Sequence, residues 1–242
     1  MLLCDLNCDM GEGIGNDELL MPYITSANIA CGYHAGDTGT MKKTVELCVK
    51  YNVAIGAHPS YPDKENFGRI DFIGFKLKPE DLPELIIDQI QQLQKVCTNA
   101  GTKLHHVKPH GALYNRAAWD GVVSSFICSS IMEFDSSLIL YGLSNSEMGK
   151  EAKSYGLKFM NEVFADRTYQ DDGSLTPRTH SNALIESTDE GIHQVLMMVN
   201  KGKVKTVTGN EISITAETIC IHGDGKNAVE FAKALRTLLT PA

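Results

Sequence analysis

The sequence has no long apolar run and no cluster of basic side chains. A membrane-spanning helix needs about 18 or more consecutive apolar residues, whereas the longest apolar runs here, at 138–143 and 195–199, are far shorter. Lys and Arg total 22 against 30 Asp and Glu, a formal net charge of −8, while nucleic-acid binding relies on clustered Lys and Arg. We therefore expect neither a membrane nor a nucleic acid as a partner.

The sequence also lacks the features of secreted proteins. Its N-terminus, MLLCDLNCDM, carries Asp5 and Asp9 where a signal peptide would have a basic start followed by an apolar stretch. The 7 cysteines are odd in number and include no Cys-x-x-Cys pair, which does not fit a disulfide framework. These absences favour a cytoplasmic protein with reduced thiols.

Several catalytic and nucleotide-binding motifs are missing as well. There is no Gly-x-Ser-x-Gly elbow to anchor a serine-hydrolase triad. The segment GLSNSEMGKE has too wide a glycine spacing for a P-loop, and Glu151 stands where a P-loop has Ser or Thr. The sequence therefore offers no recognisable ATP-binding motif of its own.

Short β-like runs alternate with longer segments of helical periodicity, which is the pattern of repeated βα units around a parallel sheet. Apolar residues share one helical face at Met41, Val45, Cys48 and Val49, for example. No linker-like segment interrupts the chain, so we expect one domain over residues 1–242, folded as a TIM-like (β/α) barrel of seven or eight units. The candidate strands are residues 2–7, 26–30, 53–57, 105–108, 138–142, 158–164, 204–208 and 218–222.

Polar side chains gather at or just after six of these strands. The carboxyl ends of parallel strands face one side of the sheet, so we expect the six groups to meet in one cleft. Ionisable groups are rarely buried without a function or a partner, and so many at strand ends indicate an active site. The groups are Asn7, Asp9 and Glu12; Asn28, His34 and Asp37; His58 and Asp63; Lys108, His110, Tyr114 and Asn115; Glu162, Asp166 and Arg167; His222 and Asp224.

The chemistry of this cleft has two interpretations. Taken singly, each residue has an ordinary explanation, such as an Asp that caps a helix. Together, Asp9 and the four strand-end histidines could bind a divalent metal that activates water, namely Asp9, His34, His58, His110 and His222. The same residues could instead work as acids, bases and substrate contacts without a metal. Arg167, which directly follows Asp166, is a candidate clamp for a substrate carboxylate.

The quoted groups resemble the motifs of the LamB/YcsF family. The strings DLNCDMGEG, SANIACGYHAGD, GAHPSYPD, VKPHGALYN, EVFADRTY with GSLTPR, and HGDG occur in the family order along nearly the whole chain. One small departure is Cys8, where the first motif is expected to have Ala. The resemblance implies a barrel related to polysaccharide deacetylases and a hydrolase that opens 5-oxoproline to glutamate with ATP and two partner subunits.

The resemblance also suggests roles for individual residues. Asp9 or Glu162 would act as the general base, Lys108 and His110 would stabilise the oxyanion, and Asp166 would belong to the catalytic group. ATP would be bound at least partly by a partner. Two alternatives stay open: a metal-dependent amide or N-acetyl-sugar hydrolase that needs no ATP, and a non-catalytic lactam-binding subunit. The residues expected to contact substrate are Asn7, Glu12, Asn28, His34, Asp37, His58, Tyr114, Arg167 and His222.

Overall fold

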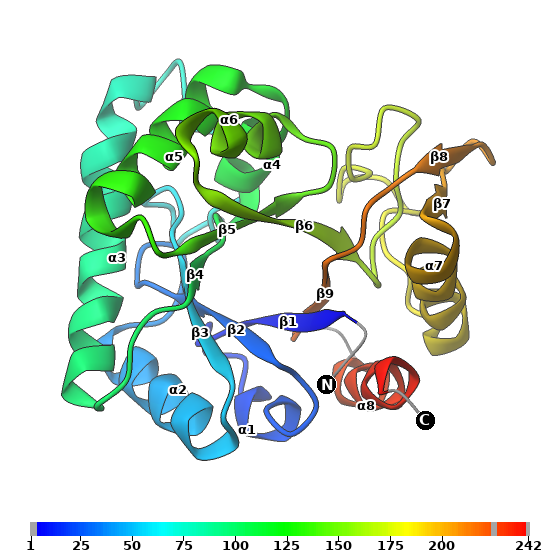
Figure 1. Cartoon of the computed structure of the whole chain (residues 1–242), viewed down its shortest axis with the longest axis horizontal. Coiled ribbons are helices and arrows are strands. Elements are labelled where there is room, and N and C mark those ends of the chain that lie inside the picture. Colours follow the sequence, from blue (N-terminus) through cyan, green and yellow to red (C-terminus); the bar gives the residue numbers. More distant parts are fainter. Residues whose placement is uncertain (1–3, 224–226, 241–242) are drawn as a thin grey trace.

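A computed structural model describes residues 4–223 and 227–240 of the chain. Within these residues, seven parallel strands close into a barrel in the order β1-β2-β3-β4-β5-β6-β9 (Figure 1). Strand β9 closes the ring because it pairs with both β6 and β1. The expected TIM-like barrel is thus confirmed in its seven-stranded form. The strands are β1 (Asp5–Met10), β2 (Ser26–Ala30), β3 (Ala54–His58), β4 (His106–Val107), β5 (Ile139–Leu143), β6 (Lys158–Phe164) and β9 (Thr218–His222).

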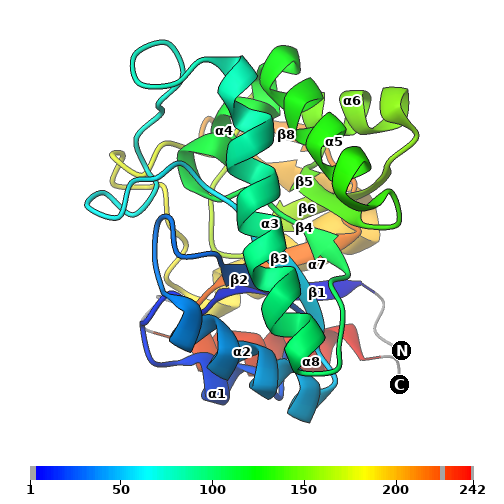
Figure 2. The ribbon, with the colours of Figure 1, turned by 90° about the vertical axis from the view of Figure 1, so that its left-hand side faces the viewer.

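Helices surround the barrel and bury their apolar faces against it. Figure 2 shows α3 lying along the outside of the barrel, where it contacts α2 and α5. Most residues of the expected apolar faces are buried, although Val49 on α2 is 50% exposed. The helices are α1 (Asp17–Leu20), α2 (Thr38–Tyr51), α3 (Leu82–Asn99) after the short 3₁₀ turn η1 (Pro79–Asp81), α4 (Gly111–Trp119), α5 (Gly121–Asp135), α6 (Glu147–Tyr155), α7 (Thr188–Lys201) and α8 (Ala228–Leu239).

The candidate strand at 204–208 is not part of the barrel, so that prediction is wrong. Residues Lys203–Lys205 form β7, which pairs antiparallel with β8 (Glu211–Ser213) in a separate two-stranded sheet beside α7. Gly209, with φ of +92°, lies in the connection and adopts a backbone conformation that favours glycine. The hairpin leads the chain from α7 to β9.

The first strand begins later and ends later than expected. It runs over Asp5–Met10 instead of 2–7, of which residues 2 and 3 lie outside the described part. Asn7 and Asp9 are therefore inside the strand, and their side chains point into the barrel, where Asn7 donates to Thr218 Oγ1 at 2.7 Å. Alternation along a strand sends Leu6 and Cys8 to the opposite face, in the apolar layer beneath the helices.

The interior of the barrel is unusually polar for this fold, whose inner layers are dominated by branched apolar residues. His106 lies across the centre, with its ring stacked on Tyr141 at 4.0 Å between centroids and its Nε2 2.8 Å from Asn28 Oδ1. Gly56 makes room for this ring, because a Cβ there would lie 2.1 Å from His106 Nε2. The polar interior supports the residues at the carboxyl ends of the strands.

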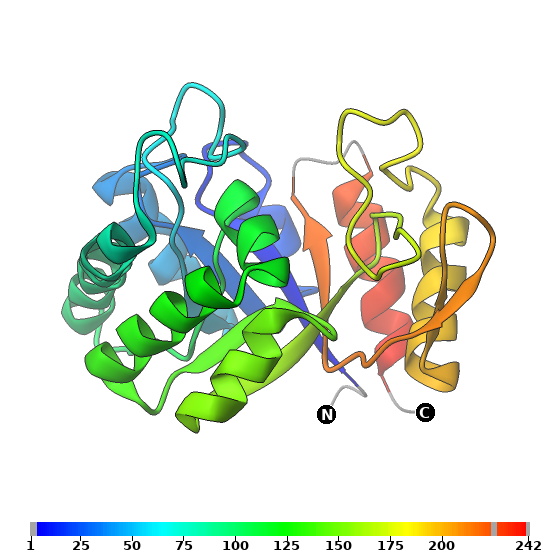
Figure 3. The same ribbon diagram turned by 90° about the horizontal axis from the view of Figure 1, so that it is seen from above.

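Long loops rise at the carboxyl ends of the strands. In Figure 3 the loop after β3 (cyan) and the loop after β6 (yellow) stand at the same end of the molecule. They frame the cavity described below. Among the described residues, no helix is long and apolar enough to cross a membrane.

Candidate active site

A cavity of about 860 Å³ opens at the carboxyl ends of the strands. Its floor includes Asp9 from β1 and Lys108 just after β4. Its walls come from α4, from the segment 143–147 after β5 and from the loop between β6 and α7. This is where the parallel direction of the strands brings their polar ends together.

Lys108 is the centre of a buried charge cluster on the cavity floor. Its Nζ lies 2.8 Å from Asp9 Oδ1 and 2.9 Å from Glu162 Oε1, and donates to Cys220 Sγ at 3.0 Å. Burial opposes the ammonium charge, but Asp9, Cys220 and Glu162 outweigh it and hold the pKa of Lys108 well above its usual value. Lys108 is therefore a fixed positive charge at the floor of the cavity.

Asp9 is held in its ionised form by its neighbours. Burial alone would raise its pKa, yet His58 and Lys108 keep the pKa of Asp9 well below the usual value. The Asn28 side-chain amide donates to Asp9 Oδ1 at 2.8 Å and to Asn7 Oδ1 at 2.7 Å. Because His106 fixes Asn28 from below, the carboxylate rests on a chain of hydrogen bonds through the barrel.

Three imidazoles and one carboxylate meet beside Asp9, and we call Glu12, His34, His58 and His110 the histidine–glutamate cluster. The rings of His34 and His110 stack at 3.8 Å between centroids, and His58 Nε2 lies 2.9 Å from His110 Nδ1. Glu12 Oε1 lies 3.4 Å from His34 Nε2. One ligand atom from each residue lies within 4.8 Å of the others.

Burial disfavours the charged form of two of these rings, those of His34 and His110. It lowers the pKa of His34 to about 3, with the nearby His58 adding to the effect. Burial also lowers the pKa of His110 well below the usual value, together with His34 and His58. Neutral imidazoles have one lone pair each and can act as ligands or proton acceptors.

His222 and Asp166 form a separate pair at the opposite wall. Asp166 Oδ2 lies 2.9 Å from His222 Nδ1 and also accepts the His222 backbone N–H at 3.0 Å. Although burial opposes it, His222 holds the pKa of the Asp166 carboxyl below its usual value. Since His222 lines the cavity and Asp166 does not, the imidazole is the group presented to a ligand and the carboxylate orients it.

Arg167 reaches the cavity but also holds the loop between β6 and α7. Its NH2 donates to Thr176 O at 2.6 Å and its Nε to Ala183 O at 3.3 Å. Burial, with Arg178 nearby, lowers the pKa of Arg167 to about 10, which leaves it charged at neutral pH. Tyr114 is buried close to Glu162, and burial followed by that carboxylate raises its pKa.

The structure brings many of the expected site residues to the cavity wall and places others behind it. Asn7, Asn28 and Glu162 lie in the barrel beneath the cavity floor, and His34 lies behind His58 and His110. Asp37 is exposed and caps α2 by accepting the Thr40 N–H at 2.8 Å, so the substrate contact expected for it has no support. The cavity is lined by Asp9, Glu12, His58, Lys108, His110, Tyr114, Arg167 and His222.

Sequence reasoning missed two parts of the site. Ser144, Asn145 and Ser146 line the cavity after β5, and the rule of polar residues after strands could have found them. His106 is not among the expected residues because it does not lie at a strand end, yet it supports Asn28 from inside the barrel. Asp224 lies outside the described residues.

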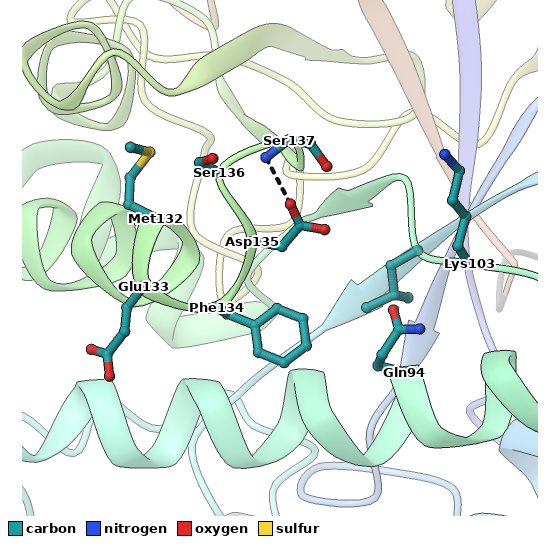
Figure 4. Close-up of a pocket in the computed structure, with 9 residues that line it drawn as sticks. Gln94, Lys103, Met132, Glu133, Phe134, Asp135, Ser136 and Ser137 are labelled. Atoms are coloured by element: carbon teal, nitrogen blue, oxygen red, sulfur yellow. Dashed lines mark hydrogen bonds between the residues drawn. The ribbon is translucent and has the colours of Figure 1, made fainter.

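A second hollow, of about 530 Å³, lies at the other end of the barrel (Figure 4). Lys103 and Ser137 on its wall precede β4 and β5. Its hydrogen bond in Figure 4 is local, from the Ser137 backbone to Asp135 Oδ1 at 2.8 Å. It has no cluster of imidazoles or buried charges among its wall residues, so the chemistry belongs to the larger cavity.

Fold and site together define a (β/α) barrel with a buried acid–base group at the carboxyl ends of its strands. The LamB/YcsF family model matches residues 4–242, and the chain belongs to this family.

Named relatives align along almost their whole length. The chain is 50% identical over 236 residues to the A subunit of 5-oxoprolinase from Oceanobacillus iheyensis, covering 96% of this chain and 91% of that one. It is 47% identical over 247 residues to the A subunit of 5-oxoprolinase from Tolumonas auensis, covering 100% and 97%. The crystal structure of a lactam utilization protein from Thermus thermophilus matches with a TM-score of 0.88 at 38% identity, covering 98% of this chain and 95% of that one. The expected kinship with polysaccharide deacetylases stays a prediction.

Proposed function

We propose that this chain is the A subunit of an ATP-dependent 5-oxoprolinase and carries the residues that open the lactam. The observation that carries the proposal is the ionised Asp9 beside the buried Lys108 ammonium at the cavity floor, in a chain 50% identical to a relative of that name. Paired carboxylate and ammonium groups suit attack of water on a carbonyl that gains negative charge.

The chemistry requires activation of a stable amide. ATP would transfer its γ-phosphoryl group to the lactam oxygen, which makes the ring carbon electrophilic. A first water then adds to that carbon, the C–N bond breaks and the nitrogen takes up a proton, which leaves the phosphate ester of the new side-chain carboxyl group. A second water hydrolyses this acyl phosphate and releases inorganic phosphate. The products are glutamate, ADP and inorganic phosphate, so all atoms are accounted for.

Asp9 is the better candidate for the general base that takes the water proton. It lines the cavity, whereas Glu162 is fully buried and pairs with Lys108. Lys108 would stabilise the negative charge of the phosphorylated lactam oxygen by giving up its contact with Cys220 Sγ, a weak acceptor.

His222 is the candidate proton donor for the ring nitrogen. Its Nδ1 is held by Asp166, which leaves Nε2 as the ring nitrogen available to a ligand. Arg167 is the candidate partner of the substrate carboxylate, in addition to its two bonds within the loop. Contacts of Glu12, His58, His110 and Tyr114 with the substrate also belong to this proposal.

ATP and the partner subunits belong to the same proposal. The relatives are named as one lettered subunit of 5-oxoprolinase, which implies a complex. We propose two partners that bind ATP at least in part, because no P-loop was found in this sequence. ATP consumption also fits a cytoplasmic location. Neither a metal-dependent deacetylase nor a non-catalytic binding subunit is favoured, since the named relatives are oxoprolinase subunits.

Reconstitution with omission of single components tests the proposal. The chain, its two partners, ATP and 5-oxoproline are mixed, each is left out in turn, and glutamate is measured. We expect glutamate only from the full mixture, and none when Asp9→Asn replaces the wild-type chain. Glutamate formation at full rate with Asp9→Asn would assign this chain a non-catalytic role, and divalent-dependent deacetylation by the chain alone would support the alternative of a metal-dependent amide or N-acetyl-sugar hydrolase.

A further inference from the structure

Backbone carbonyls next to the histidine–glutamate cluster show which ring nitrogens carry a hydrogen and which do not. His58 Nδ1 lies 2.6 Å from the Lys108 backbone carbonyl, and His110 Nε2 lies 2.9 Å from the Phe67 carbonyl. A carbonyl only accepts, so both of these ring nitrogens carry a hydrogen. The second nitrogens of the two rings, His58 Nε2 and His110 Nδ1, then face each other at 2.9 Å. Two bare lone pairs at that distance would repel, so a proton or a metal ion has to lie between or beside them, where Asp9 Oδ2 also lies 3.4 Å from His58 Nε2.

His34 adds a third lone pair to the same space. Ser60 Oγ donates to the Tyr61 carbonyl at 2.9 Å, so it accepts from His34 Nδ1, also at 2.9 Å. His34 Nε2 is therefore the bare nitrogen, and it has no hydrogen-bond partner among residues 4–223 and 227–240. Leaving a buried polar atom unsatisfied costs about 1–3 kcal/mol, which indicates that something else binds there.

A metal ion fits this space better than a shared proton. One proton can bridge His58 and His110 but leaves His34 Nε2 bare. A divalent ion satisfies all three nitrogens and takes Glu12 Oε1, 3.4 Å from His34 Nε2, as a fourth ligand. It also balances charge, because Lys108 is one ammonium in contact with the two carboxylates of Asp9 and Glu162.

The groups behind the rings are built as supports for metal ligands. Metal-binding histidines usually donate their second N–H to a carbonyl, carboxylate or hydroxyl that fixes the ring, and all three rings here do so. Gln89 holds Ser60 by bonding both its N–H and its carbonyl at 2.9 Å. Phe67, which aims its carbonyl at His110, has a φ of +57°, a strained conformation for an aromatic residue that is retained where it has a use.

The neighbouring group of Asp9, Cys220 and His222 does not carry a second metal site. Its ligand atoms also lie within 4.8 Å of one another. The Lys108 ammonium already contacts Asp9 at 2.8 Å and Cys220 at 3.0 Å. Lys108 therefore supplies the positive charge that a metal ion would bring to this group. Of these two groups, only the histidine–glutamate cluster is thus a candidate metal site.

We propose that the histidine–glutamate cluster binds one divalent transition-metal ion of the Zn²⁺ type. Three imidazole nitrogens and one carboxylate oxygen suit Zn²⁺ and its first-row neighbours, whereas Mg²⁺ and Ca²⁺ prefer oxygen ligands. Compared with the set expected from the sequence, Glu12 takes the place of Asp9 and His222. The test of this proposal is independent of the proposed function, because it measures bound metal and not glutamate.

The test measures metal uptake by the full chain, purified without metal-affinity resin and stripped with a chelator. Zn²⁺ is added, excess is dialysed away, and metal per chain is determined by atomic emission; Co²⁺ serves as a second probe through its visible absorption. We expect one equivalent, and affinity lowered at least about 100-fold in His34→Gln and His58→Gln. His193→Gln, an exposed histidine on α7, is the matched control and retains full uptake.

A variant that leaves the ligands in place tests the proposal even if the ligand variants do not fold. Ser60→Ala removes the hydroxyl that accepts from His34 and donates to the Tyr61 carbonyl but leaves all four ligands in place, so we expect folded protein with affinity lowered about 10-fold. Wild-type protein that takes up far less than one equivalent, or equal affinity in His34→Gln and His193→Gln, would overturn the proposal. So would a stripped protein in which ¹⁵N NMR finds His58 or His110 doubly protonated and Zn²⁺ leaves those signals unchanged.

Discussion

Asp166 accepts two hydrogen bonds from His222, one from the ring Nδ1 at 2.9 Å and one from the backbone N–H at 3.0 Å. The pair joins the end of β6 to the end of β9, the strand that closes the barrel. Phe164 covers the imidazole from one side, with 5.7 Å between ring centroids. The orientation of His222 is therefore fixed by the closure of the barrel.

Replacing Asp166 by Asn tests the orienting role. An amide can donate to Nδ1 and stabilise the wrong tautomer of His222, as a carboxylate cannot. We expect glutamate formation by the complex to fall about 100-fold or more, with little change in the unfolding midpoint. Asp189→Asn, an exposed aspartate in the first turn of α7, is the control and keeps the wild-type rate. An unchanged rate in Asp166→Asn would remove His222 from the mechanism.

Lys108 is predicted to be essential for stability as well as for catalysis. Lys108→Met leaves Asp9 and Glu162 as buried carboxylates without their ammonium, and breaking a buried ion pair in this way costs about 3–5 kcal/mol. The double variant Lys108→Met with Glu162→Gln should recover part of the free energy of unfolding but none of the activity. Urea unfolding and glutamate release measure the two effects separately.

The surface provides a matched comparison for that variant. Lys203 and Glu211 lie 3.2 Å apart with side chains about half exposed, and such pairs contribute about 0–1 kcal/mol. Lys203→Met should therefore change the free energy of unfolding by less than about 1 kcal/mol. If Lys108→Met costs no more than Lys203→Met, the buried cluster does not carry the charges assigned to it.

The sequence was sufficient to predict the barrel because parallel strands buried on both faces have a distinctive pattern. Residues 26–30 and 158–164 are strands with the expected bounds. Residues 204–208 carry the same β-forming residues, but a local pattern cannot distinguish a barrel strand from a hairpin. That choice depends on the register with partners that are distant in the sequence.

The candidate site could be predicted only to the level of strand ends. The common direction of the strands explains why Asp9, His58 and Lys108 meet at one cavity. It does not tell a helix cap such as Asp37 from a ligand contact. Nor could it reveal His106, whose position depends on Gly56 across the barrel. Which ring nitrogens of the histidines carry a hydrogen could not be predicted either, because this depends on backbone carbonyls that only the fold brings close to the rings.

The ion pair at the start of α5 predicts a pH dependence of stability. Asp120 caps α5 through the N–H groups of Val122 and Val123 and lies 2.7 Å from Arg116 NH2. Burial opposes ionisation, but the bond from Arg116 and these N–H groups lower the pKa of Asp120. A carboxyl with a lowered folded-state pKa stabilises above its unfolded pKa, and this stability is lost as pH falls through the folded-state pKa.

Asp120→Ala should thus cost about 1 kcal/mol at pH 7, and the difference from wild type should shrink below about pH 4. Unfolding in urea at several pH values measures it. Glu186→Ala, which removes an exposed carboxylate, is the control and should show no such convergence. A cost for Asp120→Ala that stays constant from pH 7 to pH 3 would contradict an ionic contribution.

The close approach of Gly56 and His106 inside the barrel gives the last prediction. A Cβ on Gly56 would lie 2.1 Å from His106 Nε2, and the His106 ring has little room to retreat because Tyr141 stacks on it at 4.0 Å. We expect Gly56→Ala to lower the free energy of unfolding by about 1–3 kcal/mol and to slow glutamate formation, because displacing His106 releases the Asn28 that supports Asp9. Gly121→Ala is the control for adding a methyl group, because within the described residues the atom nearest to its Cβ would be Glu147 Oε2 at 3.7 Å. Equal stability of the two variants would mean that the His106 ring can move away from the position that it has in the structure. The hydrogen bonds from His106 through Asn28 would then not explain the position of Asp9.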